Sequence, residues 1–154
     1  MLELVEGNLL EAQTEALVNA VNTEGVMGKG IALQFKRKFP EMFESYRRAC
    51  HAGEVQPGRM HVFEVGEASQ QPRYIINFPT KRRWPSRTRL EDIDAGLTAL
   101  VHEVRRLEIR SIAVPALGCG NGGLDWGDVF PRIKGVLGML QEVKVFVYPP
   151  RGPL

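Results

Sequence analysis

Two kinds of apolar pattern alternate along this chain. Short apolar runs bounded by glycine, proline or polar residues are typical of strands, and they occur at 2–4, 16–20, 60–65, 73–78, 111–115 and 143–148. Apolar residues that recur every three or four positions predict helices over 31–39, 41–49, 90–107 and 125–140. Pro40 separates the first two helices, and Thr88 and Asp125 precede the last two as possible caps.

The order of these elements predicts the fold. Strands alternate with helices, and the strands at 16–20 and 111–115 are apolar at nearly every position, which is typical of strands buried on both faces. We therefore predict an α/β fold, a three-layer α/β/α sandwich with a mixed, mostly parallel central sheet. The 154 residues suit one domain, expected over 1–149, with 150–154 as a tail or the start of a linker.

Two glycine-rich loops follow these buried strands. The first carries Gly25, Gly28 and Gly30 and runs into a helix, and the second, GCGNGGL, starts at Gly118. Glycines let backbone N–H groups approach a phosphate, and a helix N-terminus adds partial positive charge. Because ligands of such sheets bind outside the carboxyl ends of the strands, both loops can face one cleft, which suits a diphosphate with a sugar at each end. The alternative is that the second loop is only a mobile connection.

Composition and charge indicate the class of protein and the compartment to expect. At 44% hydrophobic and 25% charged residues the chain is typical of globular proteins, and its net charge of +2 is too small to require nucleic acid. Cys50 and Cys119 form no disulfide scaffold and, like the three histidines, lack metal-ligand spacing, so we expect no metal and a reducing cytoplasm. The sequence shows no leader and no apolar stretch of membrane-spanning length, so we expect no membrane partner.

The two loops resemble a known family. NAVNTEGVMGKGIA and PALGCGNGGLDW are similar to the two ligand loops of macrodomains, the ADP-ribose-binding fold, and the similarity covers nearly the whole chain. The stretch INFPTKRRW resembles the branch of antitoxin macrodomains that remove ADP-ribose from thymidine bases in DNA. That branch is similar to the terminal ADP-ribose glycohydrolases, which use a lysine.

The resemblance implies a set of ADP-ribose-binding residues. Asn8 occupies the place of an aspartate that in most macrodomains accepts the adenine amino group, and its amide oxygen can still accept that bond. Asn22 is expected at the distal ribose, and Tyr148 either stacks on adenine or is only a strand aromatic. The full expected set is Asn8, Leu9, Asn22, Gly28, Lys29, Gly30, Ile31, Gly118, Cys119, Gly120, Asn121, Gly122 and Tyr148.

Lys81 is the catalytic candidate. It follows Pro79 and Thr80 at the exit of a strand, and a lysine becomes a nucleophile or a base only when its pKa is lowered. Neighbouring arginines and a partly buried cleft would lower the pKa of Lys81. The lysine-using subfamily pairs its lysine with an acid in the second loop, whereas this chain has Asn121 there, so Lys81 acts alone on C1″ or stabilises charge. The alternative is a solvated lysine that only touches phosphate.

A basic, aromatic segment follows Lys81. Its cations attract DNA phosphates and its indole can stack on an unpaired base, so the expected DNA-binding residues are Arg82, Arg83, Trp84 and Arg87. A solvated charged face is the alternative. Cys119 lacks an evident activating base, and Glu24 is expected to be solvated.

These features together predict an ADP-ribosyl hydrolase that acts on thymidine bases of single-stranded DNA and reverses the modification made by a partner toxin. Its expected partners are ADP-ribose, ADP-ribosylated single-stranded DNA, and the transferase toxin, the last through a region outside this chain. No cofactor is expected. A non-catalytic ADP-ribose-binding module and a hydrolase of ADP-ribose esters on protein are the alternatives.

Overall fold

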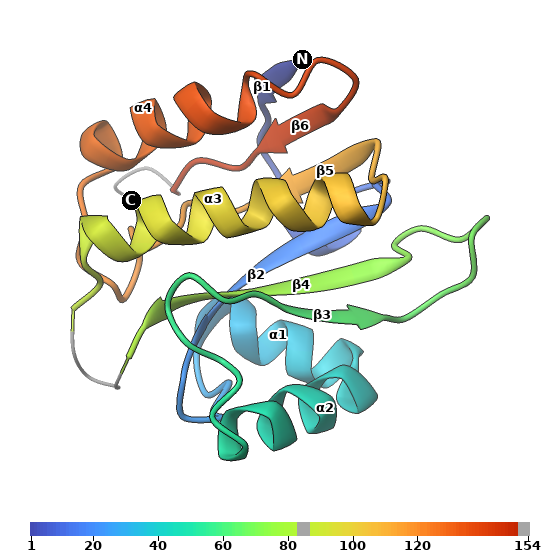
Figure 1. Ribbon diagram of the computed structural model, residues 1–154, viewed down its shortest axis with the longest axis vertical. Coiled ribbons are helices and arrows are strands. Elements are labelled where there is room, and N and C mark those ends of the chain that lie inside the picture. The colour runs from blue at the N-terminus through green and yellow to red at the C-terminus, as the bar shows by residue number, and fades with distance from the viewer. Residues whose placement is uncertain (83–86, 151–154) are drawn as a thin grey trace.

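The computed structural model describes residues 1–82 and 87–150, so the candidates Arg83 and Trp84, and the predicted tail beyond 150, lie outside the described residues. The elements in chain order are β1 (Leu2–Leu4), η1 (Leu9–Glu11), β2 (Ala16–Asn22), α1 (Gly30–Lys38), α2 (Pro40–His51), β3 (His61–Glu64), β4 (Tyr74–Lys81), α3 (Leu90–Arg106), β5 (Ser111–Val114), α4 (Trp126–Leu137) and β6 (Lys144–Val147) (Figure 1).

The strands form one sheet. In the described residues it has six strands in the order β1-β6-β5-β2-β4-β3. The pairing of β3 with β4 is antiparallel and the other pairings are parallel. The predicted mixed, mostly parallel sheet is thereby confirmed. The carboxyl ends of β2, β4, β5 and β6 consequently lie along one edge, where the two glycine loops begin.

Helices cover both faces of the sheet, which confirms the three-layer sandwich (Figure 1). Successive side chains of a strand point to opposite faces, so β2 contributes Val18 to one core and Leu17 to the other. The first core lies beneath α3 and α4, and the second lies beneath α1 and α2. Both side chains of β2 are completely buried, as the continuous apolar run predicted.

The strand that carries Lys81 is longer than predicted. β4 continues past Phe78 through Pro79 and Thr80 to Lys81, whereas the apolar pattern placed its end at Phe78. Proline donates no backbone hydrogen bond and is found in strands that lack a neighbour on one side. The pairing with β3 stops at Asn77, so Pro79 has only β2 beside it. Lys81 is therefore the last residue of a strand rather than a loop residue.

A row of polar side chains crosses the sheet inside the second core. Asn19, Asn77 and His61 lie at matching register positions of β2, β4 and β3. Asn19 Nδ2 donates to Asn77 Oδ1 at 3.1 Å, and Asn77 Nδ2 lies 3.0 Å from His61 Nδ1. The His61 Nε2 lies 3.0 Å from the Ser45 hydroxyl of α2. These bonds pair most of the polar groups in an otherwise apolar layer, whereas the buried Asn19 Oδ1 has no hydrogen-bond partner among the described residues.

The two predicted helix caps are not formed by side chains. Arg89, not Thr88, is the N-cap of α3, because the Thr88 N–H donates to the Gly122 carbonyl at 3.1 Å and fixes Thr88 to the second glycine loop. Asp125 stands at the N-cap of α4, but its carboxylate makes no capping hydrogen bond. Within residues 1–82 and 87–150, no helix is both long and apolar enough to cross a bilayer.

Candidate functional site

A cleft of about 870 Å³ lies along the carboxyl ends of the strands. Both glycine loops line it, as the sequence predicted. The expected ADP-ribose residues and Lys81 all lie in its wall: Asn8, Leu9, Asn22, Gly28, Lys29, Gly30, Ile31, Lys81, Gly118, Cys119, Gly120, Asn121, Gly122 and Tyr148. The structure therefore brings together segments that are more than a hundred residues apart in the chain.

The side chain of Asn22 organises the first glycine loop. Its Oδ1 accepts the Glu24 N–H at 2.9 Å, and its Nδ2 donates to the Val26 carbonyl at 2.9 Å. The buried Tyr46 hydroxyl lies 2.7 Å from the Asn22 carbonyl and 2.9 Å from its Oδ1. Asn22 lines the cleft, and its side-chain amide is hydrogen-bonded to its own loop and to Tyr46. Its contact with the distal ribose stays a prediction.

The first loop is also fixed to the end of β4. Asn22 and Lys81 are register partners where β2 and β4 end. The Thr23 hydroxyl donates a short hydrogen bond to the Arg82 carbonyl, and the Thr80 hydroxyl donates to the Val21 carbonyl at 3.4 Å. Lys81 therefore stands directly beside the base of the first loop.

At two positions of the second loop the structure requires glycine, at Gly118 because of its backbone conformation and at Gly122 because a side chain would have no room. Gly118 has φ +73°, a conformation that side chains disfavour. A Cβ at Gly122 would lie 2.4 Å from the Gly118 carbonyl oxygen and 2.4 Å from the Thr88 hydroxyl. Thr88 is buried beneath the loop, and its hydroxyl has no hydrogen-bond partner among the described residues. A Cβ at Gly120, in contrast, would meet no atom within 4 Å, so this position opens into free space.

Lys81 connects the two loops. Its side chain is largely buried, and its Nζ donates to the Asn121 carbonyl at 2.9 Å. Burial, and secondarily the positive charge of Lys29, lowers the pKa of the Lys81 ammonium. The described hydrogen bond of the Lys81 ammonium therefore goes to a main-chain oxygen of the second loop.

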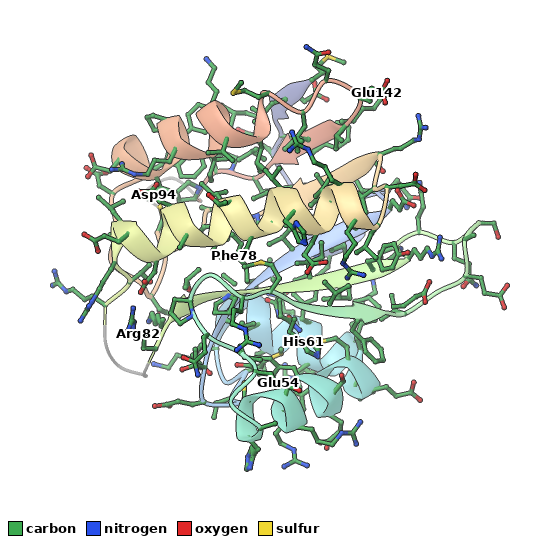
Figure 2. The ribbon with its side chains drawn as sticks, viewed as in Figure 1. Glu54, His61, Phe78, Arg82, Asp94 and Glu142 are labelled. Atoms are coloured by element: carbon green, nitrogen blue, oxygen red, sulfur yellow. The ribbon has the colours of Figure 1, made fainter. Side chains whose placement is uncertain are left out.

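The source of this pKa shift differs in part from our expectation. We expected the arginines that follow Lys81 to lower its pKa together with burial. Arg82 instead forms an ion pair with Asp92 of α3, with a closest N–O distance of 3.3 Å, and its guanidinium is directed along the outside of the molecule (Figure 2). Arg83 lies outside the described residues. Lys29 of the first loop supplies the neighbouring positive charge.

The other predicted residues have identifiable environments. The Asn8 Oδ1 accepts the Leu10 N–H at 3.1 Å and caps η1, and the same oxygen retains a second lone pair for a ligand. Burial raises the pKa of the Cys119 thiol to about 11, so this thiol stays protonated at neutral pH and is a poor nucleophile. Tyr148 is half-buried at the far end of the cleft from Lys81, beyond β5 and β2 in the strand order.

The predicted DNA-binding segment is only partly described. Arg82 and Arg87 are both exposed, and Arg87 runs alongside Gly123 of the second loop. Trp84 lies outside the described residues, like Arg83. Neither of the two described arginines lines the cleft: Arg82 follows Lys81 in the chain, and Arg87 lies beside the end of the second loop.

Sequence reasoning missed part of the cleft wall. The additional lining residues are Gly7, Ala20, Val21, Glu24, Val26, Ala32, Gln34, Thr80, Pro115, Ala116, Pro149 and Pro150. Five of them directly precede or follow a predicted residue: Gly7, Val21, Ala32, Thr80 and Pro149. Ala20 and Pro115 lie at or just after the ends of buried strands, so the strand ends were a second available signal. Val26 could also have been recognised as a lining residue, because it is an apolar residue inside a glycine loop.

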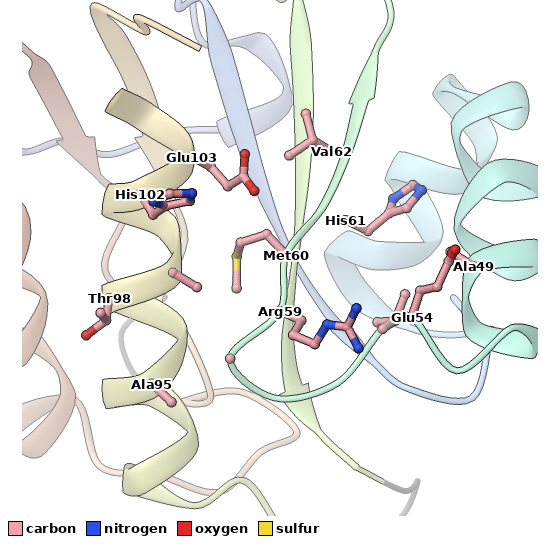
Figure 3. A pocket seen from close by; sticks show the side chains of 13 residues that line it. Ala49, Glu54, Arg59, Met60, His61, Val62, Ala95, Thr98, His102 and Glu103 are labelled. Atoms are coloured by element: carbon pink, nitrogen blue, oxygen red, sulfur yellow. The ribbon is translucent and has the colours of Figure 1, made fainter. Parts of the chain in front are cut away.

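A second, more open hollow of about 730 Å³ lies beside β3, between α2 and α3. Figure 3 shows Met60 directed toward α3 and His61 toward α2. None of the predicted site residues lines it. The described residues contain no group of three or more metal-ligating side chains here or elsewhere.

Comparison with known proteins matches the chain to a family. Residues 18–133 match the family described as Macro domain. The chain is 55% identical over 150 residues to a protein of Thermus aquaticus named DNA ADP-ribosyl glycohydrolase, which covers 97% of this chain and 41% of that relative. The chain therefore spans about two fifths of the length of the curated relatives that it matches first.

Solved structures agree with this match. The macrodomain of Mycobacterium tuberculosis DarG superposes with a TM-score of 0.95 at 53% identity, over 98% of this chain and 99% of that one. DarTG of Thermosipho africanus, solved in complex with ADP-ribose, superposes with a TM-score of 0.89 at 35% identity, over 99% of this chain and 43% of that one.

Proposed function

The chain belongs to the macrodomain family, and on that premise we propose that it hydrolyses the bond between ADP-ribose and thymidine bases of single-stranded DNA. The observation that carries the proposal is the position of Lys81. A buried lysine with a lowered pKa stands where the two phosphate-binding loops meet, bonded to Asn121 of one loop and flanked by Asn22 of the other. The names of the relatives support the same reaction.

The two loops bind and orient the ligand in this proposal. Backbone N–H groups of Gly28–Gly30 and Gly118–Gly122 surround the diphosphate, and the α1 N-terminus adds favourable charge. The adenine end lies toward Asn8 and Tyr148. The strand order places two strands between β6 and β4, so the ligand spans about 14 Å at the usual strand spacing of about 4.8 Å. The distal ribose then reaches Lys81.

Lys81 performs the chemical step. Its neutral amine attacks C1″, the bond from C1″ to the base nitrogen breaks, and the base leaves with that electron pair and takes up the proton that the amine loses. Water then hydrolyses the lysine–ribose bond, which releases ADP-ribose and restores the amine. The lowered pKa of Lys81 raises the fraction of neutral amine at physiological pH.

The proposal is tested with an oligonucleotide that carries ADP-ribosylated thymidine. We expect wild-type protein to restore the unmodified strand. We expect Lys81→Ala to lose about 10²–10⁴-fold in kcat while it still binds ADP-ribose. Lys134→Ala, which changes an exposed lysine of α4 far from the cleft, serves as the matched control. Borohydride should trap wild-type protein, but not Lys81→Ala, as a covalent ribose adduct through the ring-opened imine.

Other outcomes distinguish the competing functions. An intact DNA adduct together with cleavage of glutamate-linked ADP-ribose on protein would assign an ester hydrolase instead. Tight ADP-ribose binding without any turnover would assign a binding module. Full activity of Lys81→Ala would remove this lysine from the mechanism.

We further propose the cellular setting. The reversed modification comes from a transferase toxin, which contacts the complete protein through a region outside this chain. A cytoplasmic location fits the two free cysteines, Cys50 and Cys119. We also propose that residues 1–149 form the macrodomain and that 150–154 are a tail or the start of a linker, whose first residue, Pro150, still lines the cleft.

A further inference from the structure

An exposed valine stands at the margin of the cleft. Large apolar side chains that stay at least half exposed are few among the described residues: Met1, Leu4, Val26 and Met139. Val26 alone of these four lines the cleft, with 52% of its surface exposed. Exposed apolar side chains next to a polar site often mark contacts with the apolar part of a ligand.

The loop holds Val26 in a fixed place. Asn22 Nδ2 donates to the Val26 carbonyl at 2.9 Å, and Asn22 itself is held by the Tyr46 hydroxyl. The next residue, Met27, is fully buried in the second core, so the chain on both sides of Val26 is anchored. The side chain is therefore presented to solvent by a rigid backbone rather than left on a loose one.

Val26 lies at the reactive end of the cleft. It belongs to the loop that leaves β2, whose last residue, Asn22, is the register partner of Lys81. The same loop is fixed to β4 by the hydrogen bond from Thr23 to the Arg82 carbonyl. The adenine end, near Tyr148, is two strands away. Val26 consequently borders the space into which a group attached to C1″ would extend.

We propose that Val26 contacts the thymine base of the substrate and contributes to the selection of that base. This inference rests on the proposed function. A thymine presents an apolar C5-methyl group and a ring face, and an aliphatic side chain can make van der Waals contact with both. The phosphates, in contrast, are bound by backbone N–H groups. The product ADP-ribose no longer carries thymine at C1″, and its adenine lies at the other end of the cleft, so it does not make this contact.

The test separates contact with the base from a structural role. We expect Val26→Ala to raise KM for the ADP-ribosylated thymidine oligonucleotide about 3- to 10-fold, because the base contact is lost in the bound substrate. We expect the affinity for free ADP-ribose to stay unchanged. Val26→Thr keeps the branched shape and tests the apolar character alone. Met139→Ala, an exposed apolar residue outside the cleft, is the matched control.

A second substrate makes the test specific for thymine. In the same oligonucleotide, ADP-ribosylated deoxyuridine lacks only the C5-methyl group. We expect wild-type protein to prefer the thymidine adduct and Val26→Ala to lose that preference. An unchanged KM for Val26→Ala, or an equal loss of ADP-ribose affinity, would overturn the inference while the proposed function stands. Absence of hydrolysis by wild-type protein would overturn the proposed function itself.

Discussion

Lys81 has two possible roles, as a neutral nucleophile or as a cation, and the pH dependence of kcat distinguishes them. Because burial and Lys29 lower the pKa of Lys81, a nucleophilic amine gives a rate that rises with pH and levels off below the ordinary lysine pKa of 10.5. In Lys29→Gln the like charge is removed, the pKa of Lys81 rises, and we expect the midpoint of the kcat profile to move to higher pH.

The opposite profile would assign the other role. A lysine that acts as a cation loses activity as pH rises through its pKa, and Lys29→Gln would then extend activity to higher pH. Lys36→Gln, on the outer side of α1, controls for the change in net charge. The kcat profile is the relevant measurement, because a phosphate contact by Lys29 would change KM instead.

Two glycines of the second loop make a matched pair. A Cβ at Gly122 would collide with Gly118 and Thr88, so Gly122→Ala should lower the free energy of unfolding by about 1–3 kcal/mol in the absence of ligand. A Cβ at Gly120 meets no protein atom, so Gly120→Ala should keep the wild-type stability. Thermal denaturation and ADP-ribose titration of both variants check this difference. Equal stability of the two variants would contradict it.

At the scale of the elements, the stability that the polar row across β2, β4 and β3 contributes should depend on pH. Asn77 donates to His61 Nδ1, so this nitrogen carries no proton and the ring is neutral, in agreement with the lowered pKa that burial gives His61. The unfolded state binds its proton first, so this contribution to stability is present above pH 6.5 and is lost as pH falls below 6.5 toward the lower folded pKa.

Denaturation at several pH values measures this effect. We expect the free energy of unfolding to decrease more steeply between pH 7 and pH 5 for wild-type protein than for His61→Gln, which cannot titrate. The exposed His102, changed to glutamine, should leave the wild-type slope intact. A wild-type slope in His61→Gln would show that the row does not titrate in this range.

The elements also show which sequence patterns are sufficient to identify a helix or a strand. The buried run of β2 and the helical spacing of α3 each identified the element, because their apolar positions follow a single period. The predicted end of β4 was wrong. Pro79 fits in this strand only because the pairing with β3 has already stopped, and the local sequence does not show where that pairing stops. The prediction that Thr88 caps α3 was wrong for a similar reason: its N–H donates to the carbonyl of Gly122, which lies 34 positions further along the chain.

At the scale of the whole molecule, two exposed arginines lie near the segments that carry Lys81 and the second loop. Exposed Arg82 follows Lys81 in the chain and exposed Arg87 lies beside Gly123 of the second loop, whereas the net charge of the chain is only +2. We expect the affinity for an ADP-ribosylated oligonucleotide to fall with salt and the affinity for ADP-ribose to fall less. Replacing Arg87 with glutamine should reduce the salt slope by about one for the oligonucleotide. An unchanged slope would place the strand elsewhere.

The cleft itself was largely predictable from sequence. Glycine loops after Asn22 and after Pro115 could be assigned to one edge because parallel strands end together. The direction of the side chains could not. Asn22 faces its own loop, and Arg82 turns to Asp92 on α3, since both partners depend on how separate elements pack.

The bond between Lys81 and the Asn121 carbonyl has a consequence for substitutions at position 121. A main-chain oxygen is present whatever amino acid occupies the position, so a substitution at 121 does not remove the acceptor. We expect variants at position 121, including acidic ones, to keep this hydrogen bond and with it the orientation of Lys81. The hydrogen bond to Lys81 therefore does not depend on which side chain lines the cleft at position 121.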